Sequence, residues 1–196
     1  KDIIDQVYDA GCRWINILGG EPLLRKGIDG LIDHMHSKGM FIEITTNGFY
    51  VHKHIEALKK VDHVAISLDG NKLSNDKTRG KDSFEKIVKG IECAVENGIK
   101  VRIHATLCKR TMSGESFVFL TDFCKRLGLS LNYSENGLPG IEEMDPDFLL
   151  SEEELVFSYT LHPGANLVSF PLSIANSDIN SFFTSNNESL LTFDSI

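Results

Sequence analysis

Short β-rich segments alternate with amphipathic helical segments over the first two thirds of the chain, and this alternation constrains the fold most. Apolar residues recur at helical spacing in 28–35, 84–95 and 117–127, each followed by a glycine, at 39, 98 and 128, that marks a helix end. A shorter helical segment over 3–10 stops at Gly11. Strand-like segments lie between the helices, at 12–18, 41–46, 63–68, 101–107 and 129–133. Strands separated by helices need crossover connections, so this order predicts an α/β fold with a parallel sheet.

Helix-capping residues refine these boundaries. Asp82 precedes the helix predicted over 84–95, and Glu85 follows it three residues later. This spacing is typical of a capping box, so we expect Asp82 to cap that helix.

Polar residues occupy one alternating set of positions on all five predicted strands. The other set is mostly apolar, as at Ile42, Ile44, Ile66 and Ile103. An open sheet with helices on both faces is apolar on both sets, so the pattern favours a barrel-like sheet that curves around a wet ligand cavity. A plain α/β sheet with chance polar residues is the alternative. Trp14 is interpreted as strand packing rather than a stacking platform. The polar set comprises Asn16, Glu43, Thr45, Ser67, Arg102, His104, Thr106 and Asn132.

Three strands run into polar, glycine-containing segments where each strand ends: Gly-Gly-Glu-Pro at 19–22, Thr-Thr-Asn-Gly at 45–48 and Ser-Leu-Asp-Gly at 67–70. Ligands of parallel α/β folds bind beyond the carboxyl ends of the strands. Glycine lets backbone approach a ligand closely. Glu21 offers an anion to a ligand ammonium, and Asn47 and Asp69 suit hydroxyl or amide groups. Each segment alone is a common turn, but the three in order predict one binding site.

These motifs, with Asp76-Lys77-Thr78-Arg79-Gly80 and then Ser83-Phe84, resemble the radical S-adenosylmethionine (SAM) superfamily over most of residues 1–135. The resemblance implies a partial (β/α)6 TIM-like parallel barrel, incomplete at its N-terminal end. It implies that Gly19, Gly20 and Glu21, in one loop with Pro22, engage the amino group of the SAM methionine. It places Ser67 and Asp69 near the ribose or carboxylate, and Thr46 and Asn47 along the cavity. Arg79 is implied to meet the carboxylate or the substrate, and His104, Thr106 and Asn132 to complete the pocket.

The resemblance also implies an activity. In this family a [4Fe-4S] cluster reduces SAM to a 5'-deoxyadenosyl radical, which abstracts hydrogen from a peptide, a cofactor precursor or another small substrate. A flavodoxin or ferredoxin is the implied reductant. A cluster-free, non-catalytic binding module derived from the same fold is the alternative. An aldolase-like barrel ranks last, because the strand interiors hold no lysine for a Schiff base.

The cysteines depart from the family pattern. Three thiolates of a CxxxCxxC loop bind such a cluster, and the sequence contains no CxxxCxxC. Cys12, Cys93, Cys108 and Cys124 are scattered, and all four are predicted to be small buried hydrophobic residues rather than metal ligands. We expect the first strand and the cysteine loop to lie upstream of Lys1, and this chain alone to perform no radical chemistry. The sequence assigns no catalytic residue.

Charge is distributed unevenly along the chain. All 20 Lys and Arg lie at or before Arg126, whereas 11 of the 28 Asp and Glu follow it, so 127–196 has a formal charge of −11. A helical pattern over 151–157 breaks at His162-Pro163-Gly164. The prediction is a core domain over 1–157 and an atypical C-terminal segment over 158–196, β-type or poorly ordered. The sequence has no cluster of basic residues, so we do not expect nucleic acid as a partner. No apolar run is long enough to span a membrane, and the scattered cysteines favour the cytoplasm.

Overall fold

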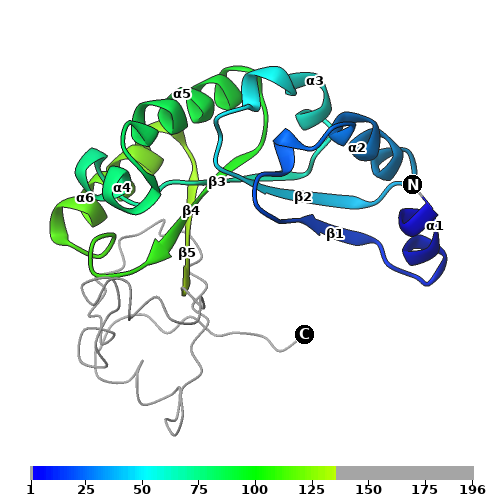
Figure 1. The fold of residues 1–196 in the computed structure, drawn as a ribbon, viewed down its shortest axis with the longest axis horizontal. Coiled ribbons are helices and arrows are strands. Elements are labelled where there is room, and N and C mark those ends of the chain that lie inside the picture. The colour runs from blue at the N-terminus through cyan, green and yellow to red at the C-terminus, as the bar shows by residue number, and fades with distance from the viewer. Residues whose placement is uncertain (1, 136–196) are drawn as a thin grey trace, which may run out of the picture.

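A computed structural model describes residues 2–135 as a curved parallel sheet with helices along its outer side (Figure 1). The strand order is β1-β2-β3-β4-β5, and every neighbouring pair is parallel. The strands are β1 (Trp14–Ile17), β2 (Phe41–Thr46), β3 (His63–Ser67), β4 (Val101–Leu107) and β5 (Ser130–Glu135). The helices are α1 (Asp2–Asp9), α2 (Ile28–Ser37), α3 (Ile55–Leu58), α4 (Lys72–Arg79), α5 (Ser83–Glu96) and α6 (Gly114–Leu127), with short 3-10 turns η1 (Pro22–Leu24) and η2 (Val51–Lys53).

This arrangement confirms the predicted α/β fold with a partial, TIM-like parallel barrel. Consecutive strands are neighbours throughout, and a helical crossover connects each parallel pair. The predicted domain boundary at 157/158 and the predicted C-terminal segment lie outside the described residues. None of the helices within 2–135 is long and apolar enough to cross a membrane.

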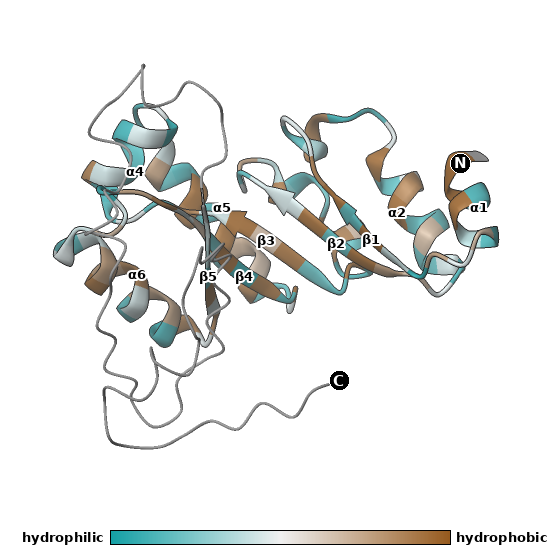
Figure 2. Ribbon diagram, turned by 90° about the horizontal axis from the view of Figure 1, so that it is seen from below, coloured by the Kyte–Doolittle hydropathy of each residue, from teal (hydrophilic) through white to brown (hydrophobic). Residues whose placement is uncertain are grey.

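The apolar set of strand positions forms the core between sheet and helices. Ile44, Ile66 and Ile103 are fully buried and belong to one cluster with Ile32 of α2 and Ile91 of α5. Hydrophobic, brown segments run along β2 and β3 of the ribbon (Figure 2). Burial of one such side chain stabilises the fold by about 1.5–3 kcal/mol. This packing determines which face of the sheet the helices cover.

Glycine ends the long helices as predicted, because Gly39, Gly98 and Gly128 adopt positive φ angles of 69°, 71° and 66°. Asp82 has a φ of 60°. It is the N-cap residue of α5, as predicted, but the expected capping hydrogen bond of its side chain is not formed. Instead, the Phe84 backbone N–H donates to Asp76 Oδ1 at 2.9 Å, so a side chain of α4 caps α5.

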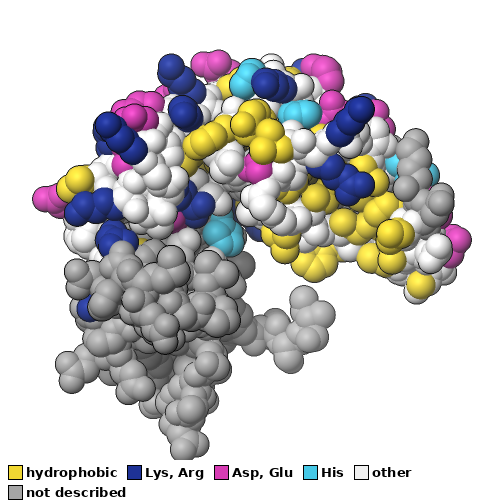
Figure 3. Space-filling model, in the orientation of Figure 1, with side chains coloured by type: hydrophobic (Ala, Val, Ile, Leu, Met, Phe, Trp, Pro, Cys, Tyr) yellow, Lys and Arg dark blue, Asp and Glu magenta, His cyan; other side chains and the backbone are white. Residues whose placement is uncertain are grey.

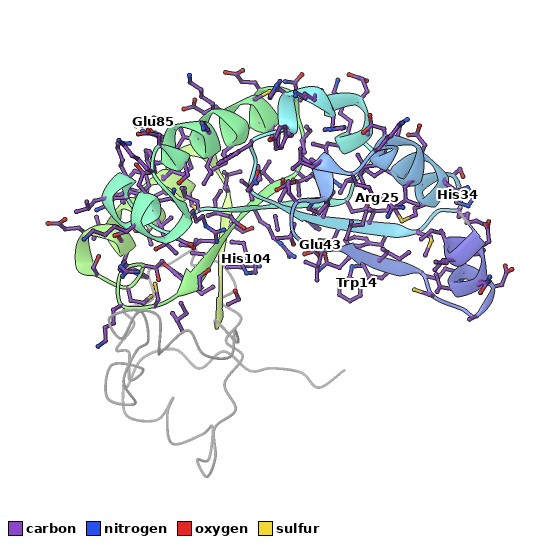
Figure 4. The ribbon with its side chains drawn as sticks, in the orientation of Figure 1. Trp14, Arg25, His34, Glu43, Glu85 and His104 are labelled. Atoms are coloured by element: carbon purple, nitrogen blue, oxygen red, sulfur yellow. The ribbon has the colours of Figure 1, made fainter. Side chains whose placement is uncertain are left out.

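The strand register brings the polar set onto the side of the sheet opposite the helices, which we call the concave face. Asn16 is level with Glu43, Ser67 with His104, and His104 with Asn132. Trp14, Glu43 and His104 all project from this side (Figure 4). The predicted packing of Trp14 within the sheet is wrong, since its exposed fraction is 58%.

Candidate functional site

The Glu21 carboxylate joins the ends of β1 and β2. The Thr46 hydroxyl donates to Glu21 Oε1 at 2.6 Å, and the Asn47 backbone N–H donates to Oε2 at 2.8 Å. The Leu23 backbone N–H also donates to Oε1, at 3.0 Å, so Glu21 is the N-cap of η1. Hydrogen bonds to a carboxylate are stronger than neutral ones. Two strand ends that lie far apart in the sequence are therefore held together at the edge of the sheet where the strands end. We call this edge, at the carboxyl ends of the strands, the rim.

The backbone at Gly19 and Gly20 borders open space. A Cβ added at either position meets no protein atom within 4 Å, and Gly19 has a φ of 132°, which L side chains rarely adopt. Pro22 is buried directly after this backbone and starts η1. The rim thus leaves room for a ligand beside two exposed peptide groups.

A second group of predicted residues meets at the ends of β3 and β4. Asp69 is fully buried, its Oδ1 accepts from the Thr106 backbone N–H at 2.7 Å, and its Oδ2 lies 2.7 Å from Arg79 Nε. Arg79 Nη2 also donates to the Thr106 hydroxyl at 3.4 Å. The Asp69 backbone N–H donates to the buried side chain of Asn75. Asn75 has no strand-end position, so sequence reasoning missed it.

Ser67, His104 and Asn132 form a row across β3, β4 and β5 on the concave face. His104 Nε2 lies 2.6 Å from the Ser134 hydroxyl, a contact that the sequence did not reveal. Burial is the main cause that lowers the pKa of His104, and the positive charges of Arg102 and Arg79 lower it further. The imidazole is therefore uncharged at neutral pH.

An ion pair between Glu43 and Arg102 crosses the concave face. Ala65 of β3 is level with Arg102 and is fully buried, so its small side chain lets the two charges meet across the intervening strand. Glu43 is 5% exposed, and burial lowers the pKa of Arg102. The alternating pattern identified both residues as polar members of this face, but it gave no sign that they pair.

These groups fit SAM better than they fit an iron–sulfur cluster. Open backbone at Gly19 and Gly20, fixed carboxylates and neutral hydroxyl and amide groups suit an amino acid joined to a ribose. The cysteines do not converge: among residues 2–135 the one group of three potential ligands is Asp76, Asp82 and Glu85. Cys108 and Cys124 are buried as predicted, whereas Cys12 and Cys93 are partly exposed.

Comparison with known proteins identifies the family. The family model described as the radical SAM superfamily matches residues 1–124. The chain belongs to the radical SAM superfamily. SAM and a [4Fe-4S] cluster are the cofactors of this family, and the residues of this chain do not fit the cluster.

Similar proteins include enzymes of this superfamily. A GTP 3',8-cyclase of Campylobacter fetus is 32% identical over 143 residues, which cover 68% of this chain and 43% of the cyclase. An Fe-coproporphyrin III synthase of Methanosarcina barkeri is 35% identical over 61% of this chain and 31% of the synthase. SuiB of Streptococcus suis bound to S-adenosylmethionine superposes with a TM-score of 0.60 at 27% identity, over 68% of this chain and 32% of SuiB. The chain thus spans less than half the length of these relatives.

Proposed function

We propose that this chain is the cofactor-binding core of a radical SAM enzyme and binds SAM at the rim formed by 19–22, 46–47 and 67–69. The observation that carries this proposal is the set of hydrogen bonds from Thr46 and Asn47 to Glu21. These bonds hold two of the three motif segments together beside the open backbone of Gly19 and Gly20. If the motif segments were only unrelated turns, they would not be held side by side in this way.

The contacts suggest different tasks for the predicted residues. Glu21 already accepts three hydrogen bonds from its own chain, so we assign it to positioning the loop while the backbone at Gly19 and Gly20 approaches the SAM amino group. Asp69, which is fully buried and held by Arg79 and Thr106, lies near the ribose or carboxylate in this proposal. Ser67, His104 and Asn132 complete the cavity from the concave face.

The complete enzyme, in this proposal, cleaves SAM reductively and abstracts hydrogen from its substrate. A [4Fe-4S] cluster would supply the electron for that chemistry, and this chain contains no CxxxCxxC loop to hold it. Peptides, cofactor precursors and other small molecules are the substrate classes under consideration. SuiB has been solved with its precursor peptide SuiA, which supports the peptide class. We propose a flavodoxin or ferredoxin as the reductant, and the cytoplasm as the location.

Isothermal titration of the chain with SAM tests the binding site. Gly20→Val is expected to abolish SAM binding and to leave thermal unfolding unchanged, because a Cβ at this position points into ligand space and meets no protein atom within 4 Å. His36→Ala, an exposed position on α2, is the matched control and should bind SAM as the parent does. Equal SAM affinity of the parent and Gly20→Val would refute this site.

The non-catalytic binding module is the competing function, and SAM affinity alone does not separate the two. Iron content and release of 5'-deoxyadenosine, measured on the natural polypeptide that contains this chain, decide between them. An enzyme releases 5'-deoxyadenosine after chemical reduction. A binding module takes up SAM and returns it intact.

A further inference from the structure

The concave face carries almost no free charge, which restricts what can bind there. Among the concave-face positions of the five described strands, Asp, Glu, Lys or Arg occurs at two only, Glu43 and Arg102. These two side chains pair with each other. At the rim above them, Asp69 and Arg79 form a second closed pair. The described part of this face is thus electrically balanced before any ligand arrives.

Several other polar groups on this face are neutral side chains that can donate and accept hydrogen bonds. Asn16 and Asn132 carry amides, Ser67 carries a hydroxyl, and His104 stays uncharged at neutral pH because burial and the neighbouring arginines lower its pKa. Such groups complement the N–H and C=O of a peptide backbone. They offer no unpaired cation to a phosphate.

Aromatic side chains line the end of the concave face that is remote from the rim. Trp14 and Phe41 are level on β1 and β2 and are 58% and 40% exposed. The Phe41 ring lies 5.7 Å from the His63 ring, centroid to centroid. We call these three residues the aromatic ledge. Hydrophobic side chains gather along this part of the molecule (Figure 3), and exposed aromatic surface on a concave face is typical of a binding site.

We propose that the concave face binds an uncharged stretch of a peptide substrate, with an apolar side chain on the aromatic ledge and its backbone against the neutral polar groups. This inference rests on the proposed function, because it places the substrate on the same strands that end at the SAM rim. Thr46, at the rim, is the fifth residue after Phe41 on β2, so at about 3.3 Å per residue the ledge lies roughly 16 Å from the rim. A substrate that reaches from ledge to rim is therefore elongated, as an extended peptide is.

A polyphosphate fits this face poorly. Its charges need arginine or lysine donors, and Arg102 on this face and Arg79 at the rim already serve carboxylates. Binding a phosphate would require Arg102 to leave Glu43, which is 5% exposed and would remain as a buried, unpaired charge. The face thus selects against nucleoside triphosphates, the substrate class that the name of the similar GTP 3',8-cyclases denotes.

Fluorescence of Trp14 tests the proposal, because Trp14 is the one tryptophan of the chain. The probe is an acetylated and amidated hexapeptide with two phenylalanines among glycines and serines, and GTP is the comparison ligand. We expect a saturable blue shift of Trp14 emission with the peptide and none with GTP. Phe41→Ala should weaken peptide binding about tenfold through lost ring contact. Val118→Ala, an exposed position on α6, is the control and should match the parent.

Three results would overturn the inference: a shift by GTP at lower concentration than by the peptide, unchanged peptide affinity in Phe41→Ala, or a ligand-free shift that grows with protein concentration. The last result means that a second copy covers the ledge. Calorimetry with SAM on the same samples separates the two proposals. SAM binding without a peptide response refutes the peptide site alone, whereas failure to bind SAM refutes the proposed function.

Discussion

Glu21 shows how one side chain links sequence order to site geometry. Its carboxylate receives hydrogen bonds from Leu23, Thr46 and Asn47, two of them from a strand end some 25 residues away. Each charge-assisted bond contributes on the order of 1.5–3 kcal/mol. The sequence predicts Glu21 as a ligand for an ammonium group. In the structure, its hydrogen bonds hold the loop that carries Gly19 and Gly20 in place.

His104 yields a prediction at the same scale. Its pKa lies below the ordinary 6.5, mainly through burial and then through Arg102 and Arg79. Because the unfolded chain takes up this proton more readily, stability is complete above 6.5 and falls as pH drops below that value toward the folded pKa. Arg102→Gln should raise the His104 pKa, since it removes a positive neighbour. NMR titration of the His104 ring, assigned with His104→Gln, measures the shift.

Within residues 2–135, the groups that act on His104 are Arg102 on β4, Arg79 on α4, Asp69 after β3 and Ser134 on β5. Lys125→Gln, an exposed position on the last turn of α6, serves as the charge-matched control and should leave the titration unchanged. A lower His104 pKa in Arg102→Gln would contradict the stated electrostatics.

At the scale of elements, α5 packs against the turn that follows β2, and Gly90 makes this possible. A Cβ at Gly90 would lie 2.1 Å from the Gly48 carbonyl oxygen. Gly90→Ala should therefore push α5 off the turn that carries Asn47 and destabilise the protein by about 1–3 kcal/mol, despite the better helix propensity of alanine.

Gly30→Ala is the matched control for Gly90→Ala. Gly30 also lies inside a helix, α2, but a Cβ there meets nothing within 4 Å. This variant should stabilise by about 0.5–1 kcal/mol, because only the conformational freedom of glycine is lost. Chemical denaturation measures both changes, and opposite signs are the expected result. Stabilisation by both substitutions would show that the α5 contact does not constrain the fold.

The junction of α4 and α5 should be sensitive to acid through Asp76. The Lys72 ammonium, and then the Phe84 N–H, lower the pKa of Asp76 to about 2 from 3.8. The carboxylate thus adds stability above pH 3.8 that is lost as pH falls toward about 2. Asp76→Asn should flatten this part of the pH dependence of thermal unfolding. An identical acid profile in parent and variant would rule out the contribution of Asp76.

The elements differ in how readily their sequences predicted them. The predicted strands 41–46 and 101–107 match β2 and β4, and the long helices end at the expected glycines. These elements were predictable because a helix or strand that buries one face has apolar residues at regular spacing. Helix α4 has little apolar periodicity and was not predicted. It is held by polar contacts, with the Asn71 side chain accepting from the Ser74 N–H and Asn75 buried beneath Asp69. Such contacts depend on tertiary neighbours that local periodicity does not encode.

At the scale of the whole molecule, the curvature of the sheet decides what the site can do. Strand ends and face polarity were predictable because each depends on position along a single strand. The Glu43–Arg102 pair and the His104–Ser134 contact were not, since they join side chains of different strands across the concave face. Prediction from sequence therefore located the rim and the polar face, while the structure supplied the pairing that makes this face electrically neutral.

The distribution of thiols leads to a prediction for the whole chain. Cys108 and Cys124 are buried, and burial raises the pKa of Cys124 to about 12, so it is not a thiolate at neutral pH. Cys12 lies in the loop before β1 and Cys93 on α5, and no three cysteines converge within residues 2–135. A cluster with three thiolate ligands therefore has no site among them.

Anaerobic treatment of this chain with iron and sulfide should leave no [4Fe-4S] absorption after desalting, and dithionite should release no 5'-deoxyadenosine from added SAM. SAM binding by titration should persist in the same sample, because the rim at Gly19 and Gly20 needs no thiol. Stoichiometric cluster absorption that disappears in Cys12→Ser or Cys93→Ser would mean that these thiols come together in a way that the described fold does not allow.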